Sequence, residues 1–249
     1  MNTNDFRIEW YRWIRSRRAL ALLVVMIFVG VTAPLLTKHL PDLIGSSSGL
    51  QVIKQPEWRD GLQGYIKQSS QLGGVICIVM VCQVCGIRRE TPLGIFYFTR
   101  TESPRALYVP RMVMSLVVVT AVALAGAICA LYETWASFGT LEIRPALGPL
   151  AVELCALVLF SALTAGLAAV TRSAAWGGGI AGAVWAAGLF AAAATKISPY
   201  LPTSALAPSV VSLTWTDAAK ALLPLLALAV AAVVAALVRP IRYSGRARS

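Results

Sequence analysis

Six long apolar stretches dominate the pattern of hydrophobic and polar positions, and short polar segments separate most of them. A helix that crosses a bilayer needs about 20 mostly apolar residues. The six segments of suitable length are Ala19–Leu36, Ser70–Ile87, Leu107–Leu131, Leu147–Thr171, Ala174–Thr195 and Ala218–Val238. The pattern predicts an all-α membrane protein in which residues 1–249 form a single domain with six transmembrane helices.

The segment before the first apolar stretch alternates aromatic and basic residues over about three helical turns. Its aromatic side chains share one face at helical spacing, whereas its arginines fall largely elsewhere. We expect an amphipathic helix in the membrane interface, with the tryptophans in lipid and the arginines toward the headgroups. The alternative is a plain basic flank that stops transfer of the first span. The expected helix covers residues 5–17 and carries Phe6, Trp10, Arg12, Trp13 and Arg15.

Composition agrees with a membrane protein, because 57% of the residues are hydrophobic and 13% are charged, against about a quarter charged in soluble domains. The formal net charge is +11. Arginines gather at both ends of the chain and in the loop after the second span, whereas most lysines fall in the other loops. Basic residues are retained on the cytoplasmic side, so we expect both termini to be cytoplasmic in a bacterial plasma membrane. The positive charge then indicates anionic lipid and not nucleic acid as the partner.

Two of the segments on the opposite side are longer than simple turns. Residues 39–67 contain several glycines and prolines and are expected to form a small outer cap. Residues 196–217 are apolar and contain Pro199, Pro202 and Pro208. This composition is typical of short broken helices that dip back into the outer leaflet, where protein contacts must satisfy the backbone polar groups. We therefore expect outer re-entrant helices before the sixth span.

Few residues indicate catalysis or metal binding. The glycine cluster at Trp176–Gly182 lacks the lysine that reaches a phosphate in a Walker A loop, so ATP is not expected to bind to this chain. His39 is the single histidine. Cys82 and Cys85 stand one helical turn apart, a spacing that suits a soft metal, but packing between helices is the favoured reading. We expect no enzyme activity, no metal and no cofactor on the chain.

Two features of the spans have two readings each. Glu153 is an acid within the fourth span, and such residues mark functional sites by default; it lines a cavity or pairs with a polar neighbour, or else it reaches the outer boundary. Gly178 and Gly182 form a GxxxG pattern in the fifth span, which permits close approach of two helices. In a helix rich in alanine and glycine the same pattern also arises by coincidence.

The loop at residues 88–106 carries the richest signal, with the sequence RRETPLGIFYFTRTESPRA. A short helix at Leu93–Phe98 would present an aromatic ridge. Aromatic residues and arginine are favoured at the cores of protein interfaces, so the ridge is a candidate surface for a protein partner. The alternative is a loop that anchors in the headgroup layer.

The whole architecture resembles the membrane subunit of an ABC-2-type exporter. In that family an interfacial helix precedes six spans, and the loop after the second span holds a glutamate, a Gly-Thr pair, a short helix, a proline with arginine or serine, and a basic residue that opens the third span. The matching positions here are Glu90, Gly94, Ser103-Pro104-Arg105 and Arg111. The chain departs from the pattern at Ile95, which replaces the threonine, and at Pro92, which lies between the glutamate and the glycine.

The resemblance implies that the loop is a cytoplasmic coupling helix seated in a groove of a separate ABC ATPase, which binds ATP and Mg. It implies a second permease copy or a related permease, with Gly178 and Gly182 at the seam, and outward transport. Because few polar residues lie in the spans, we expect a hydrophobic or amphipathic substrate such as a drug, a peptide or a lipid-like molecule. The coupling residues it implies are Glu90, Gly94, Phe96, Phe98, Arg100, Pro104, Arg105 and Arg111. Two alternatives are an ATP-independent secondary transporter or channel and a membrane scaffold without transport.

Overall fold

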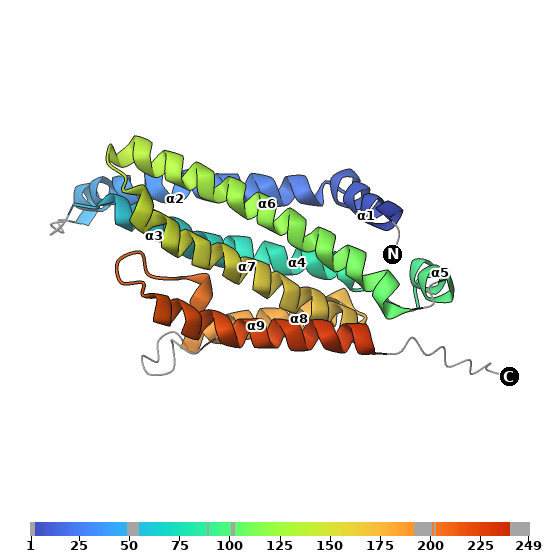
Figure 1. The fold of residues 1–249 in the computed structure, drawn as a ribbon. Coiled ribbons are helices and arrows are strands. Elements are labelled where there is room, and N and C mark those ends of the chain that lie inside the picture. The colour runs from blue at the N-terminus through green and yellow to red at the C-terminus, as the bar shows by residue number, and fades with distance from the viewer. Residues whose placement is uncertain are drawn as a thin grey trace.

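The computed structural model describes residues 3–48, 55–88, 90–100, 103–191, 201 and 203–239, and within these ranges every regular element is a helix. The long helices run roughly side by side (Figure 1). The elements are α1 (Thr3–Arg15), α2 (Arg18–Ser48), α3 (Trp58–Gln68), the π-helix η1 (Ser69–Gly73), α4 (Gly74–Cys85), α5 (Pro92–Arg100), α6 (Pro104–Phe138), α7 (Ile143–Thr171), α8 (Ala174–Ala191), the 3-10 turn η3 (Ser204–Leu206) and α9 (Trp215–Val238).

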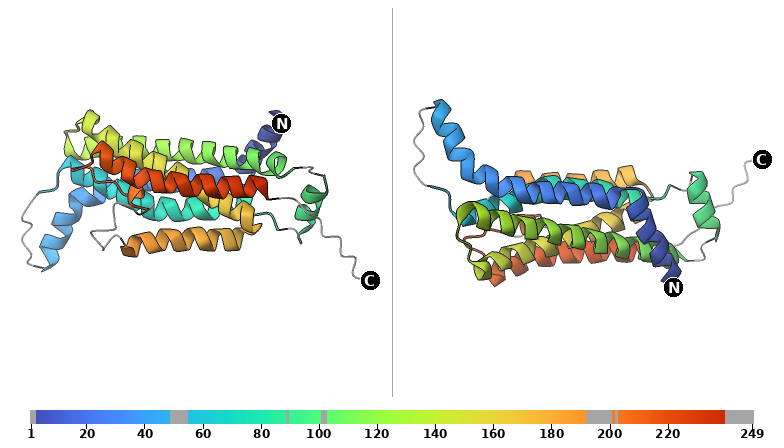
Figure 2. Two further views of the ribbon diagram at one scale, coloured as in Figure 1. Left: turned by 60° about the horizontal axis from the view of Figure 1, so that its bottom comes forward. Right: turned by 90° about the horizontal axis from the view of Figure 1, so that it is seen from above.

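The bundle has two distinct ends. The short helices α1 and α5 lie at one end, together with the α7–α8 turn and the end of α9; we call this the α5 end (Figure 1). At the other end, the α3 end, lie α3, the α6–α7 turn and the segment before α9. Figure 2 shows that α1 leaves α2 at a steep angle and that α5 lies across the direction of the long helices. The sharp turn between α1 and α2 is made at Arg17, whose φ is 58°.

Five helices are long and apolar enough to cross a membrane: Arg18–Pro41, Trp58–Cys85, Pro104–Phe138, Ile143–Thr171 and Trp215–Val238. The expectation of an all-helical, multi-pass membrane protein is therefore confirmed. The second span differs from its predicted start at Ser70, because α3, η1 and α4 form one continuous helix from Trp58.

The predicted span Ala174–Thr195 falls on α8, of which 18 residues are described. At 1.5 Å per residue this is about 27 Å, slightly less than a hydrocarbon core of about 30 Å. The remainder of that segment lies outside the described residues, so the sixth span stays a prediction.

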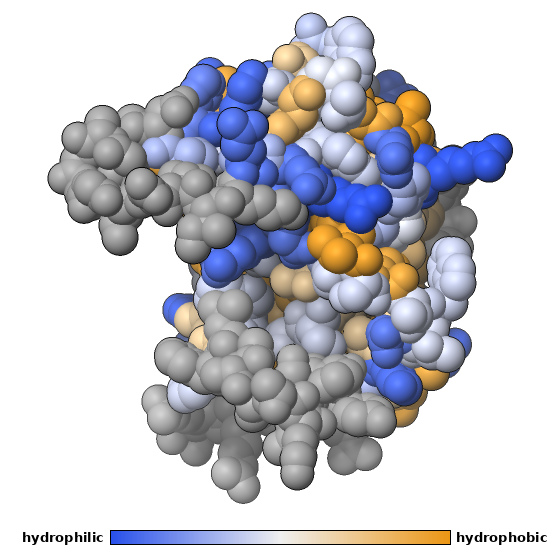
Figure 3. Space-filling model, turned by 90° about the vertical axis from the view of Figure 1, so that its left-hand side faces the viewer, coloured by the Kyte–Doolittle hydropathy of each residue, from blue (hydrophilic) through white to orange (hydrophobic). Residues whose placement is uncertain are grey.

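Apolar side chains on the flanks of the bundle, such as Val24, Phe28 and Val230, are more than half exposed. In a soluble protein such surface would mark an interface, but here it is the surface expected to face lipid. Figure 3 looks at the α3 end, where hydrophilic residues gather across the end of the bundle with apolar ones among them. This distribution suits an end that emerges from the bilayer.

The backbones of α2 and α6 meet directly at a pair of glycines. A Cβ atom added to Gly30 would lie 2.6 Å from the carbonyl oxygen of Gly126, and one added to Gly126 would lie 3.0 Å from that of Met26. Small residues at helix crossings in membranes allow this approach and the dispersion contacts that follow from it.

The expected outer segments are organised differently from the prediction. In place of a separate cap, α2 continues past Pro41 to Ser48, and α3 already begins at Trp58. Between α8 and α9 the described residues contain the 3-10 turn η3 as their single helical element, and residues 196–200 and 202 of the expected re-entrant segment lie outside them.

The side chain of Gln63 on α3 holds this irregular segment. Its Nε2 donates to the carbonyl oxygen of Pro208 at 3.2 Å, and its Oε1 accepts from the N–H of Val210 at 2.8 Å. The amide thus satisfies two backbone groups that no helix pairs.

We expect Gly30→Ala to lower the midpoint of thermal unfolding in detergent, because the new methyl group would push α2 away from α6, at a cost of about 1–3 kcal/mol. The matched control is Gly179→Ala on α8, where an added Cβ meets no atom within 4 Å. That variant should be unchanged or slightly more stable, since alanine is favoured over glycine in a helix by about 1 kcal/mol. Equal stability of the two variants would contradict direct contact between the backbones.

Candidate functional site

Helix α1 turns a polar face, and not only an apolar one, toward the bundle. Glu9 and Trp13, which lie one above the other on a helix, are 6% and 0% exposed. Trp10 is 43% exposed and Arg15 is also exposed, whereas Phe6 is half-buried. The expectation that Trp13 lies in lipid is therefore wrong: α1 packs against α2 and α6, so only its outer face is left for the membrane surface.

Glu9 forms a buried ion pair with Arg111 of α6. The Nε of Arg111 donates to Oε1 of Glu9 at 3.1 Å, and the two side chains are 2% and 8% exposed. The residues are 102 positions apart in the chain, so the pair fixes α1 against α6. Ser115 Oγ donates to the backbone carbonyl of Arg111 one turn further along α6, at 2.7 Å.

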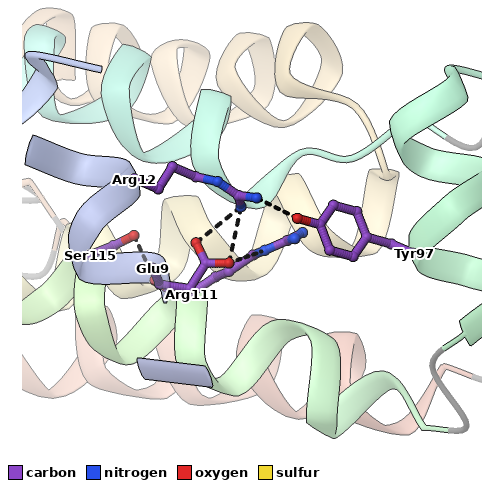
Figure 4. Close-up of polar contacts among 5 residues, drawn as sticks. All are labelled: Glu9, Arg12, Tyr97, Arg111 and Ser115. Carbon is purple, nitrogen blue, oxygen red and sulfur yellow. Dashed lines mark hydrogen bonds and ion pairs between the residues drawn. The ribbon is translucent and has the colours of Figure 1, made fainter. Parts of the chain in front are cut away.

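Arg12 extends this pair to helix α5. Its Nη1 donates to both carboxylate oxygens of Glu9 at 3.0 Å, and its Nη2 donates to Oη of Tyr97 at 2.5 Å (Figure 4). The guanidinium carbon of Arg111 lies 4.4 Å from the centroid of the Tyr97 ring, within the range of a cation–π contact. Glu9, Arg12, Tyr97 and Arg111 thus join α1, α5 and α6 in one cluster with a buried Glu9–Arg111 pair and a part-buried Arg12 and Tyr97. We call it the Glu9 cluster.

The chain turns into α5 through three local features. Pro92 is the first residue of the helix, a position where proline is favoured because its missing N–H has no helical partner. Thr91 acts as a cap, since its Oγ1 accepts from the N–H of Gly94 at 3.1 Å. A Cβ at Gly94 would lie 1.9 Å from the carbonyl oxygen of Arg88, so a side chain at this position would open the turn.

The apolar side chains of α5 point in different directions. Ile95 and Phe96 are 45% and 48% exposed, whereas Phe98 is 5% exposed. The ring of Phe98 lies 5.6 Å below the guanidinium of Arg172 in the α7–α8 turn. Of the expected ridge, Ile95 and Phe96 therefore form an outward apolar patch, and Tyr97 and Phe98 fasten the helix to the bundle.

The remaining predicted coupling residues lie around this helix but do not form one surface. Glu90 is exposed in the turn before α5. Pro104 is the first residue of α6, behind the cap Ser103, and Arg105 is exposed. The side chain of Arg100 lies outside the described residues.

A second polar group lies nearer the α3 end, inside the predicted membrane region. Glu153 of α7 is 2% exposed and lies close to Tyr65 and Ser69, so it does not reach the outer boundary. Among the described residues, Oε1 of Glu153 and Oγ of Ser69 have no hydrogen-bond partner. Ser69 begins the π-helix η1, and such helices occur frequently at functional sites.

The two glycines of the expected seam face different surroundings. A Cβ on Gly178 would lie 3.5 Å from the Sγ of Cys82 on α4, whereas one on Gly182 would meet no atom within 4 Å. Gly178 thus serves packing within the chain, and Gly182 faces outward. Cys82 and Cys85 are buried, and the residues that the structure describes contain no group of three metal-binding side chains.

Sequence reasoning missed Glu9, Tyr97 and Arg172, which make contacts that hold the α5 end together. The available signal was the acid at position 9, which shares a helical face with Trp13 in an otherwise arginine-rich segment. Comparison with known proteins adds no further guide: no family model, curated protein or solved structure matches the chain.

We expect Glu9→Gln to destabilise the protein by about 3 kcal/mol, because it leaves the buried guanidinium of Arg111 and the part-buried one of Arg12 without their carboxylate. The measurement is chemical unfolding in detergent, followed by tryptophan fluorescence. The control is Glu142→Gln, which removes the exposed 3.7 Å pair of Glu142 with Arg59 and should cost less than about 1 kcal/mol. A cost for Glu9→Gln no larger than that of the control would show that the Glu9 cluster does not stabilise the fold.

Proposed function

We propose that this chain is the membrane-spanning subunit of an ATP-driven ABC-2-type exporter and that separate cytoplasmic ATPase subunits bind its helix α5. The observation that supports this most directly is the construction of α5. The helix lies beyond the long helices and across them, exposes Ile95 and Phe96, and is fastened underneath by Tyr97 and Phe98. A helix that must receive a force needs both an exposed contact surface and a firm attachment.

The distribution of charge supports a cytoplasmic position for the α5 end. Arginines at this end far outnumber the acids Asp5, Glu9 and Glu90, whereas acidic and basic residues are balanced at the α3 end. Basic residues mark the cytoplasmic side, which gives cytoplasmic termini in a bacterial plasma membrane. The described arginines of the α5 end are Arg7, Arg12, Arg15, Arg17, Arg18, Arg88, Arg105, Arg111, Arg172 and Arg239.

In this function α5 transmits movement to several helices at once. Through Tyr97 it is bonded to α1 and stacked on α6, and through Phe98 it contacts the α7–α8 turn. A push from the ATPase would therefore move α1, α6 and the α7–α8 turn together. In this function the partner ATPase, and not this chain, would bind ATP and Mg and carry the catalytic residues. A second permease copy or a related permease would complete the pathway.

The proposed substrate class follows from the side chains that the spanning helices could present to a transported molecule. The described spans carry few polar side chains outside the Glu9 cluster and the surroundings of Glu153, which favours a hydrophobic or amphipathic molecule such as a drug, a peptide or a lipid-like compound. Outward transport is the direction that the family resemblance implies.

A second candidate is an ATP-independent transporter, which the buried Glu153 beside a π-helix favours. A carboxyl group with an unpartnered oxygen inside the membrane is suited to carry a proton or bind a cation. If this second function is correct, transport should continue in membranes that lack any ATPase. Transport should stop in the Glu153→Gln variant.

We expect the double variant Ile95→Ala/Phe96→Ala to lose at least nine-tenths of the Walker-motif ATPase that co-purifies with the wild-type chain from native membranes. In liposomes it should no longer alter the rate of ATP hydrolysis by that ATPase. Truncation of exposed apolar anchors at an interface centre commonly costs 2 kcal/mol or more, whereas the fold should be unaffected because neither side chain is buried.

The matched control is Ile8→Ala/Tyr11→Ala, two side chains of α1 that are 57% and 48% exposed at the same end. It should retain the ATPase. If both double variants retain it, or if no Walker-motif ATPase accompanies the wild type, the proposed function is wrong and the ATP-independent candidate is favoured.

A further inference from the structure

A cleft of about 350 Å³ opens at the α5 end, beside the Glu9 cluster. It is bounded by α1, the start of α2, the end of α4 and the linker that leads to α5. Four arginines line it, namely Arg12, Arg18, Arg88 and Arg111, together with the neutral side chains of Gln83 and Thr91. No acidic side chain is among the described residues that line it.

Among the described residues, the acidic side chains do not balance the charge of this cleft. Glu9 is the one carboxylate that bonds to the cleft arginines among the described residues, and it is shared by Arg12 and Arg111. Arg12 also lies close enough to Arg18 for their like charges to interact unfavourably. Asp5 and Glu90, the other described acids at this end, do not line the cleft.

One atom in particular indicates a missing acceptor. Nη1 of Arg111 is buried and has no hydrogen-bond partner among the described residues, and the whole side chain is only 2% exposed. A buried donor on a charged group is costly to leave unpaired. Arg111 is also one of the residues that line the cleft, so a group bound there would lie beside this side chain.

We propose that the cleft binds a phosphate group. Guanidinium forks match the oxygens of phosphate in paired, charge-assisted hydrogen bonds, and arginines from α1, α2, the α4–α5 linker and α6 surround the space. A phosphate would neutralise the excess positive charge of these arginines. This inference does not depend on the proposed transport function.

Two sources can supply the group: the headgroup of an anionic membrane lipid, or phosphate from solution. The lipid is the source that the position of the cleft suggests. Beside it, the outer face of α1 exposes Trp10, Tyr11 and Ile14, residues suited to the membrane interface, so a headgroup lies at the same level. The experiment separates the two sources.

The test uses the purified, delipidated full chain in a neutral detergent. One arm titrates short-chain phosphatidylglycerol in mixed micelles, with phosphatidylcholine as the uncharged reference. The other arm titrates sodium phosphate against sodium chloride at constant ionic strength. Binding is read as the rise in the thermal unfolding midpoint and as bound lipid counted by native mass spectrometry.

We expect saturable binding in at least one arm, weakened tenfold or more in Arg18→Gln/Arg88→Gln. These two arginines line the cleft but do not bond to Glu9, so the Glu9 cluster remains intact. The control Arg7→Gln/Arg105→Gln removes the same charge from exposed positions outside the cleft and should bind within threefold of wild type. If the cleft double variant does not fold, the single variant Arg88→Gln replaces it, and its binding should be at least threefold weaker than that of wild type.

Binding of phosphatidylglycerol alone would assign the cleft to a lipid headgroup, and binding in both arms would show that the phosphate group suffices. Binding that does not saturate in either arm would overturn the proposal. An equal loss in the cleft variant and in the control variant would overturn it as well, because general charge attraction would then explain the result.

Discussion

The geometry of the α5 end depends on one buried charge, the carboxylate of Glu9. An ion pair that is removed from water is stable only where hydrogen bonds satisfy the groups around it. Glu9 meets this condition through the Nε of Arg111 and the Nη1 of Arg12, which allows α1 a single rotational position against α6. In this position Trp13 lies in the core. Tyr97 of α5 stacks on Arg111, so the Glu9–Arg111 pair also fixes the position of α5.

A second constraint is the continuous helix from Trp58 to Cys85, which joins the two ends of the molecule. The π-helix η1 changes its hydrogen-bonding pattern in the middle, and the carbonyl oxygen of Ser70 accepts from Nε1 of Trp185 on α8 at 3.2 Å. Near the middle of this helix, Ser69 lies beside Glu153. Near its C-terminal end, Gln83 lines the cleft that is surrounded by four arginines. One rigid element therefore contacts both polar regions of the protein.

The hydropathy pattern was sufficient to predict the features of the fold that the thickness of the bilayer determines. It placed four spans close to their bounds, because the length of an apolar helix is set by membrane thickness, but it missed the start of the second span at Trp58. It also placed α5 in the loop after the second span. Pro92, a departure from the family pattern, proves to be a favourable first residue of that helix. The pattern could not assign Trp13, because lipid and protein core are equally apolar and a tryptophan suits both. It also could not reveal η1 or the bonds of Gln63, which arise from tertiary contacts between segments distant in the chain.

The excess of guanidinium groups around Glu9 argues against a purely structural role for this end. One arginine and one glutamate would fasten α1 to α6, and each further buried positive charge opposes folding unless something compensates it. Arg12 has a structural task, since it reaches Tyr97. Arg18, which is half-buried, and Arg88, which is exposed, make no such link and still line the cleft. The phosphate group proposed above would supply the compensating negative charge. An anionic headgroup bound between these arginines would connect α1, α4 and the linker that leads into α5. In the proposed function, α5 is the helix that receives force from the ATPase.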